Sequence, residues 1–117
     1  MKKILVADDE TSIRLLYSEE LKEEGYEVYQ AANGLEALEV VDKIPLDLVI
    51  LDIKMPEMDG IEALRQIKEK QPDLPVLLST AYGEYRQDFA TWASDEYLVK
   101  SSDLEDLKSA VKRYLKE

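Results

Sequence analysis

The sequence predicts an α/β fold in which a doubly wound parallel sheet carries helices on both faces. Strand-like and helix-like stretches alternate five times along the 117 residues, which is typical of parallel strands joined by helical crossovers. The apolar runs Ile4–Ala7, Leu48–Leu51 and Val76–Leu78 lack polar alternation, as expected of strands covered on both faces. Polar residues directly follow or close four of the strand-like runs, which places them at one edge of the sheet.

The elements can be assigned in order along the chain. The first strand is expected at Lys3–Ala7, and the helix that follows at Thr11–Glu24 is ended by Gly25. We expect the remaining strands at Glu27–Ala31, Leu48–Leu51, Pro75–Ser79 and Glu96–Val99. We expect the remaining helices at Gly34–Lys43, Asp59–Lys70, Glu84–Ala93 and Ser102–Lys116.

The last helix shows the clearest period. Its apolar stripe consists of Leu104, Leu107, Val111 and Tyr114. Lysines lie away from this stripe, so we expect the stripe to pack against the sheet. Ser102 or Asp103 is expected to cap the start of this helix.

The size of the chain, 13.4 kDa, fits one domain spanning residues 1–117 with a single core. No stretch approaches the roughly 18 continuous apolar residues that a membrane span needs. The apolar start is interrupted by Asp8 and Asp9, and no small-residue cleavage site follows, so it does not match a signal peptide. We therefore expect a soluble, cytoplasmic protein with no membrane partner.

Composition excludes several kinds of chemistry. The chain has no cysteine, which excludes disulfides, thiolate zinc sites and cysteine nucleophiles. It has no histidine, so a phosphohistidine in any reaction of this chain must belong to a partner. The net charge of −11 argues against direct binding to nucleic acid, because phosphate contacts need clustered lysines and arginines.

Five residues at strand ends form the candidate site. They are Asp8, Asp9, Asp52, Thr80 and Lys100. In an open α/β sheet, ligands bind beyond the carboxyl ends of the strands. A single aspartate there would be an ordinary turn or cap residue, but five suitable residues at four strand ends indicate a functional site.

These residue types suit a divalent metal and a phosphoryl group. Crowded carboxylates repel one another unless a cation intervenes, and Mg²⁺ typically binds through one or two carboxylates while keeping waters for phosphate oxygens. Asp52 would then be free to attack phosphorus and form an acyl phosphate. Lys100 would compensate charge on the phosphoryl oxygens, and the hydroxyl of Thr80 would donate to them.

At these residues the chain resembles the response-regulator receiver domains of two-component signalling, over essentially its whole length. The matching segments are Val6–Glu10, Ile50–Gly60, Ser79–Ala81 and Tyr97–Lys100. The resemblance implies a flavodoxin-like (βα)5 fold with a five-stranded parallel sheet in the order 2-1-3-4-5. It also implies Mg²⁺, or Mn²⁺, as the cofactor.

The resemblance also implies roles for individual residues near the metal. Asp52 would be the phosphoacceptor. Asp9 and Asp52 would bind the metal directly, together with the backbone carbonyl of Lys54. Asp8 would act mainly through water.

Three further residues would serve the phosphoryl group and the output. Lys100 would pair with the phosphoryl group, Thr80 would move toward it, and the ring of Tyr97 would change rotamer as the switch. The implied phosphodonor is a sensor histidine kinase or a histidine phosphotransferase, and the implied target is a downstream protein. The domain would not be an enzyme in the usual sense, but would catalyse its own phosphorylation and dephosphorylation.

A narrower likeness links the chain to stand-alone phosphorelay carriers of the sporulation type. It depends on Gln30–Leu38, Thr80–Glu84 and Ala110–Leu115. The chain departs from the family pattern at Ser101, where a proline in a cis peptide is usual. A cis bond before a non-proline residue costs about 2.5–4 kcal/mol, so we expect a trans, rearranged loop after Lys100.

Three functional hypotheses follow. The first is a phosphorylatable switch, which acts either as a relay carrier or as an effector. The alternative is a receiver-like docking module that signals without phosphorylation, which the altered loop after Lys100 leaves open. A phosphatase-like hydrolase is disfavoured, because the residue two after Asp52 is Lys54 and not the aspartate that would serve as general acid.

Overall fold

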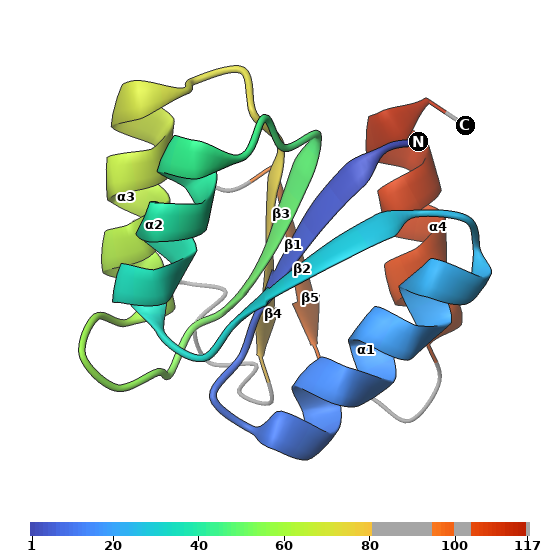
Figure 1. Ribbon diagram of the computed structural model, residues 1–117, viewed down its shortest axis with the longest axis horizontal. Helices are drawn as coiled ribbons and strands as arrows, with labels where there is room; N and C mark the ends of the chain where they lie inside the picture. The colour runs from blue at the N-terminus through green and yellow to red at the C-terminus, as the bar shows by residue number, and fades with distance from the viewer. Residues whose placement is uncertain (81–94, 100–103, 117) are drawn as a thin grey trace.

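The computed structural model describes residues 1–80, 95–99 and 104–116 (Figure 1). The described elements follow the order β1 (Lys3–Ala7), α1 (Thr11–Glu23), β2 (Glu27–Ala31), α2 (Gly34–Lys43), β3 (Leu48–Asp52), α3 (Gly60–Lys70), β4 (Val76–Thr80), β5 (Glu96–Val99) and α4 (Glu105–Leu115). The helix expected at Glu84–Ala93 lies outside the described residues.

The strands form one parallel sheet in the order β2-β1-β3-β4-β5, which confirms the expected doubly wound topology. Helices α2 and α3 cover one face of the sheet, and α1 and α4 cover the other (Figure 1). Ala7 lies beside Leu51, and Asp52 lies beside Ser79. The chain therefore leaves β1, β3 and β4 at the same edge of the sheet, where the polar residues were expected to meet.

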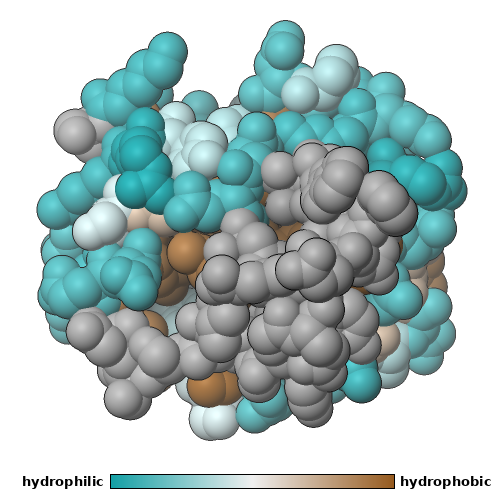
Figure 2. All heavy atoms as spheres, turned by 180° about the vertical axis from the view of Figure 1, so that it is seen from behind, coloured by the Kyte–Doolittle hydropathy of each residue, from teal (hydrophilic) through white to brown (hydrophobic). Residues whose placement is uncertain are grey.

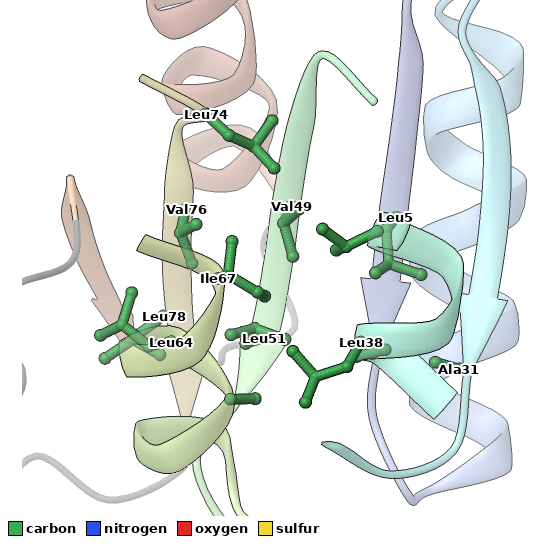
Figure 3. Packing of buried hydrophobic residues seen from close by; sticks show 14 of the residues in the cluster. Leu5, Ala31, Leu38, Val49, Leu51, Leu64, Ile67, Leu74, Val76 and Leu78 are labelled. Carbon is green, nitrogen blue, oxygen red and sulfur yellow. The ribbon is translucent and has the colours of Figure 1, made fainter. Parts of the chain in front are cut away.

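Two apolar layers form the core, one on each face of the sheet. The layer under α2 and α3 includes Leu5, Val49, Leu51, Leu64, Ile67, Val76 and Leu78 (Figure 3). The layer under α1 and α4 includes Ile4, Val6, Leu21, Leu48, Ile50, Leu77, Leu107 and Val111. Successive residues of β1, β3 and β4 alternate between the two layers, and all five residues of β3 are buried. This double burial explains why these strands read as continuous apolar runs.

The last helix differs from the sequence-based expectation at its start. It begins at Glu105, with Leu104 at the N-cap position and no side-chain hydrogen bond there, whereas the pattern predicts a start at Ser102 and a cap from Ser102 or Asp103. Residues 102 and 103 lie outside the described part. The expected packing stripe is confirmed, since Leu104, Leu107 and Val111 are buried.

The start of β5 is tied to three other elements. The Oδ2 atom of Asp95 accepts hydrogen bonds from the backbone N–H of Val76 and from Nζ of Lys68, both at 2.8 Å. The Asp95 N–H donates to the Val76 carbonyl at 2.8 Å. The Tyr114 hydroxyl donates to the Asp95 carbonyl at 2.6 Å. Burial, followed by a hydrogen bond to Glu96, raises the pKa of the Tyr114 hydroxyl above its ordinary value.

The surface of the described part is predominantly hydrophilic in the view of Figure 2. Among all described residues, the exposed large apolar side chains are Met1, Leu15, Leu16 and Leu35. Among the described residues, no helix has both the length and the apolar character that crossing a membrane requires.

Candidate metal centre

Three carboxylates meet at the carboxyl edge of the sheet. Asp8 follows β1, Asp9 comes next in the chain, and Asp52 is the last residue of β3. One oxygen from each of the three lies within 4.8 Å of the others. Asp8 and Asp52 are only 2% and 6% exposed, while Asp9 is exposed. The cluster therefore has a buried base and one member open to solvent.

The backbone and side chain of Asp8 are held by three neighbours. Its N–H donates to the carbonyl of Ala31 in β2 at 3.0 Å, which extends the sheet pairing by one residue. Its Oδ1 accepts from the N–H of Glu10 at 2.9 Å. Its carbonyl accepts from Nη1 of Arg14, in the first turns of α1, at 2.8 Å. The loop from β1 to α1 is thus fixed at the residue that begins the cluster.

Asp52 is positioned by strand pairing and by a close approach of α3. A Cβ atom built at Gly60 would lie 2.0 Å from the Asp52 carbonyl oxygen, so only glycine fits there. The N–H of Gly60 donates to the Ile53 carbonyl at 2.8 Å. Asp59 caps α3 by accepting from the Glu62 N–H at 2.9 Å. The end of β3 and the start of α3 are therefore held against each other by direct backbone contact.

The loop between β3 and α3 also packs against the start of α2. The N–H of Gly34 donates to the Met58 carbonyl at 2.9 Å, and a Cβ built at Gly34 would lie 2.3 Å from that oxygen. Glu57 adopts a left-handed backbone conformation with φ of 69°. This loop contains Lys54, whose side chain is exposed. The same contacts therefore set the path of the backbone at Lys54.

The structure brings together three of the five strand-end residues expected at the site. Thr80 ends β4, where its backbone pairs with Val99 of β5, and Tyr97 pairs with Leu78. The side chains of Thr80 and Tyr97, and all of Lys100 and Ser101, lie outside the described part. Their expected roles, and the geometry of the peptide after Lys100, stay predictions.

Sequence reasoning missed three residues that shape the site: Arg14, Gly34 and Gly60. Both glycines stand at the first position of a helix, directly after an Asn or Asp cap. That placement was a usable signal for a close backbone approach. Nothing in the local pattern singled out Arg14, because an arginine early in a helix is usually a solvated surface residue.

The donor set fits a hard divalent cation. It consists of oxygen ligands only, and Mg²⁺ prefers carboxylate, carbonyl and water oxygens. Two buried carboxylates beside a third repel one another, and a divalent ion relieves that repulsion. Asp9 is exposed, so its side of the cluster is accessible to solvent.

Comparisons with known proteins match this chain to one family. The family model for the response regulator receiver domain matches residues 4–112. Sporulation initiation phosphotransferase F of Bacillus subtilis is 43% identical over 97% of this chain and 94% of its own length. The regulatory protein AtoC of Escherichia coli is 37% identical over 98% of this chain, which spans only 25% of AtoC.

Solved structures show the same fold. The response regulator TrrA of Thermotoga maritima, crystallised with Mg²⁺-BeF, is 51% identical with a TM-score of 0.95, covering 97% of this chain and 99% of TrrA. A complex of histidine kinase ThkA with TrrA matches at a TM-score of 0.93 and 51% identity, over 98% of this chain and 99% of the matched chain. With the motifs, the topology and the carboxylate cluster in agreement with these matches, the chain belongs to the response regulator receiver domain family.

Proposed function

We propose that this receiver domain accepts a phosphoryl group on Asp52 from a phosphohistidine of a partner protein. The reaction requires Mg²⁺ or Mn²⁺, and phosphorylation switches partner binding through the region of Thr80 and Tyr97. The main support is the placement of the Asp52 carboxylate at the end of a buried strand, within 4.8 Å of the carboxylates of Asp8 and Asp9.

The roles of the residues follow from this arrangement. The ion, when bound, offsets the negative charge of the carboxylates and of the phosphoryl oxygens. Asp9, Asp52 and the carbonyl of Lys54 would bind it directly, and Asp8 through water. A carboxylate oxygen of Asp52 forms the new bond to phosphorus, while the P–N bond to the partner's histidine breaks and its electron pair stays on the imidazole nitrogen.

In this proposal Thr80 and Lys100 bind the phosphoryl group, and Tyr97 changes rotamer once the group is in place. Lys100 would neutralise a phosphoryl oxygen and the Thr80 hydroxyl would donate to another. Thr80 belongs to β4, which lies between β3 and β5 in the sheet, and Tyr97 belongs to β5. This order supports a switch in which a change beside Asp52 reaches β5 through β4.

Several observations support a histidine-containing protein as the phosphodonor. This chain has no histidine of its own. TrrA has been seen in complex with a histidine kinase, and the Bacillus relative is a phosphotransferase by name. We propose a sensor histidine kinase or a histidine phosphotransferase as the donor and a protein as the downstream target. We further propose that residues 1–117 act as one receiver domain in the cytoplasm, where the domain catalyses its own phosphorylation and dephosphorylation.

The test is phosphorylation by a small phosphodonor such as acetyl phosphate. With Mg²⁺, the intact mass of the wild-type chain should rise by one phosphoryl group, and hydroxylamine should reverse the change, because it cleaves acyl phosphates. Asp52→Asn should not be modified, whereas Asp42→Asn, an equal charge change on the exposed face of α2, should react normally. Modification that persists in Asp52→Asn, or a wild-type chain that binds Mg²⁺ and stays unmodified, would contradict the proposal.

A second measurement shows whether the domain acts as a relay carrier or as an effector. A relay carrier passes its phosphoryl group on to a histidine phosphotransferase. An effector keeps the group and gains affinity for a protein target. Following the radioactive phosphoryl group from this chain to an added phosphotransferase distinguishes them.

A further inference from the structure

We propose that Arg14 is a positioning residue for the metal site, which it serves by fixing the peptide group between Asp8 and Asp9. This inference rests on the proposed metal-dependent function and goes beyond it, because Arg14 is not one of the proposed metal ligands. The bond from Arg14 Nη1 to the Asp8 carbonyl, at 2.8 Å, is the observation from which it starts.

The guanidinium of Arg14 bridges two elements. Its Nη1 donates to Asp8, and its Nε donates to Oε1 of Gln30 on β2 at 3.2 Å. Two bonds from different nitrogens of a planar group fix the orientation of that group. The Asp8 carbonyl is thus held by a donor that is itself held from the neighbouring strand.

Fixing this carbonyl also fixes the orientation of the backbone at Asp9. The carbonyl of Asp8 and the N–H of Asp9 belong to one planar peptide group, so a bond to the first sets the orientation of the second. The carboxylate of Asp9 makes no hydrogen bond or ion pair with any residue in the described part of the chain. Its position therefore depends on its own backbone, and Arg14 restrains that backbone.

The surroundings of Arg14 permit substitutions there without steric strain. Arg14, Gln30, Ala31, Ala32 and Glu36 line an open hollow of about 160 Å³. Within it, Glu36 already accepts a hydrogen bond from the Ala32 N–H at 2.8 Å. A shorter side chain at position 14 would leave this open hollow larger and would create no clash, so the variants described next should fold.

If Arg14 acts only through its charge, replacing it should change the metal affinity in one direction; if it positions Asp9, the change should be in the opposite direction. A positive charge beside a carboxylate cluster repels a divalent cation, so its removal by Arg14→Gln should tighten metal binding if charge is all that Arg14 contributes. Loss of positioning should instead weaken binding, because Asp9 is no longer held toward the cluster. Hydrogen-bonding partners that orient metal ligands typically contribute about 10–100-fold in affinity, which exceeds the opposing effect of one solvent-screened charge.

The experiment measures Mn²⁺ affinity from the electron paramagnetic resonance signal of the free ion, using the full chain. Arg14→Gln should bind Mn²⁺ about tenfold more weakly than the wild type. Arg14→Lys should recover part of the loss, because an ammonium reaches the Asp8 carbonyl but cannot bond Gln30 in the same planar geometry. Arg65→Gln is the matched control: it removes the same charge from an arginine whose partners are Glu62 and Glu69 on the exposed face of α3, and should bind as the wild type does.

A second readout excludes a general loss of folding. Urea unfolding without metal should show that Arg14→Gln is fully folded under the binding conditions, and the amide NMR signals of Asp9 and Glu10 should shift in that variant. Equal or tighter Mn²⁺ binding by Arg14→Gln would overturn the positioning role while leaving the proposed function intact. A wild-type chain that does not bind Mn²⁺ would overturn both.

Discussion

The α-carbon of Gly60 lies directly against the carbonyl oxygen of Asp52. A Cβ atom at Gly60 would fall 2.0 Å from that oxygen, a distance that no real contact of this kind shows. The proposed phosphoacceptor and the first residue of α3 therefore depend on each other, although the whole loop between β3 and α3 separates them in the chain. A substitution at Gly60 should therefore displace the backbone of Asp52 although it makes no contact with the Asp52 side chain.

Gly60→Ala should lower both stability and metal affinity. The added methyl must push α3 away from the end of β3, and overpacking of this kind costs about 1–3 kcal/mol of unfolding free energy. Urea unfolding and Mn²⁺ titration of the same variant measure the two effects.

Gly25→Ala is the control for that substitution. Gly25 has φ of 99°, and a methyl group added to it would have no neighbour within 4 Å, so alanine there should cost about 1–2 kcal/mol from backbone strain alone. Its Mn²⁺ affinity should equal that of the wild type. Unchanged metal binding in Gly60→Ala would show that the contact does not position Asp52.

Mg²⁺ should stabilise the folded chain through the carboxylate cluster. An ion that binds only the folded state adds about 2.7 kcal/mol at one hundred times its dissociation constant. Asp9→Asn should lose most of this increase, whereas Asp42→Asn should keep it, since Asp42 lies on the exposed face of α2 and pairs with Lys70. Thermal unfolding with and without Mg²⁺ provides the comparison.

The metal-free stability of Asp9→Asn gives an independent check on the cluster. With no ion present, one fewer carboxylate relieves repulsion from Asp8 and Asp52, so this variant should unfold at the same or a higher urea concentration than the wild type. A clear loss of stability instead would mean that the Asp9 carboxylate has a structural role in the folded chain.

Ser18→Ala should stabilise the chain. Ser18 lies fully buried on α1, and its hydroxyl has no hydrogen-bond partner in the described part of the structure. An unpaired buried polar group costs about 1–3 kcal/mol, and removing it should recover part of that cost.

The control for Ser18 is Ser109→Ala, at an exposed position inside α4. That change alters helix propensity alone, by about 0.5 kcal/mol. Urea unfolding of both variants isolates the burial effect as their difference. An equal gain from the two substitutions would show that the Ser18 hydroxyl is satisfied in solution, for example by a bound water.

Two substitutions at Asp95 should separate the two interactions of its side chain, the hydrogen bond from the Val76 N–H and the ion pair with Lys68. Asp95→Asn keeps an oxygen that accepts from the Val76 N–H and loses only the ion pair with Lys68, which is worth about 0.2–1 kcal/mol. Asp95→Ala leaves the N–H of Val76, a fully buried residue, without its acceptor and should cost about 1–3 kcal/mol. Urea unfolding gives both values, and hydrogen exchange at the Val76 amide should speed up only in Asp95→Ala.

Much of this protein can be predicted from local pattern. The apolar run before Asp52 and the run before Asp8 predict buried parallel strands, and parallel strands place their carboxyl ends at one edge whatever else the chain does. The expected meeting of these aspartates follows from that geometry alone. The absence of histidine likewise determined the direction of phosphoryl transfer in the proposal, because only composition is needed to exclude an internal donor.

The contacts that give the site its shape were decided by tertiary structure. The approach of Gly60 to Asp52, that of Gly34 to Met58, and the bond from Arg14 to Asp8 each join separate elements. Their distances depend on the angle at which a helix packs on the sheet, and that angle results from the combined packing of the two core layers. A local pattern reports which residues a strand or helix contains. It does not report how closely two elements approach, since that distance belongs to the packed structure and to no single segment.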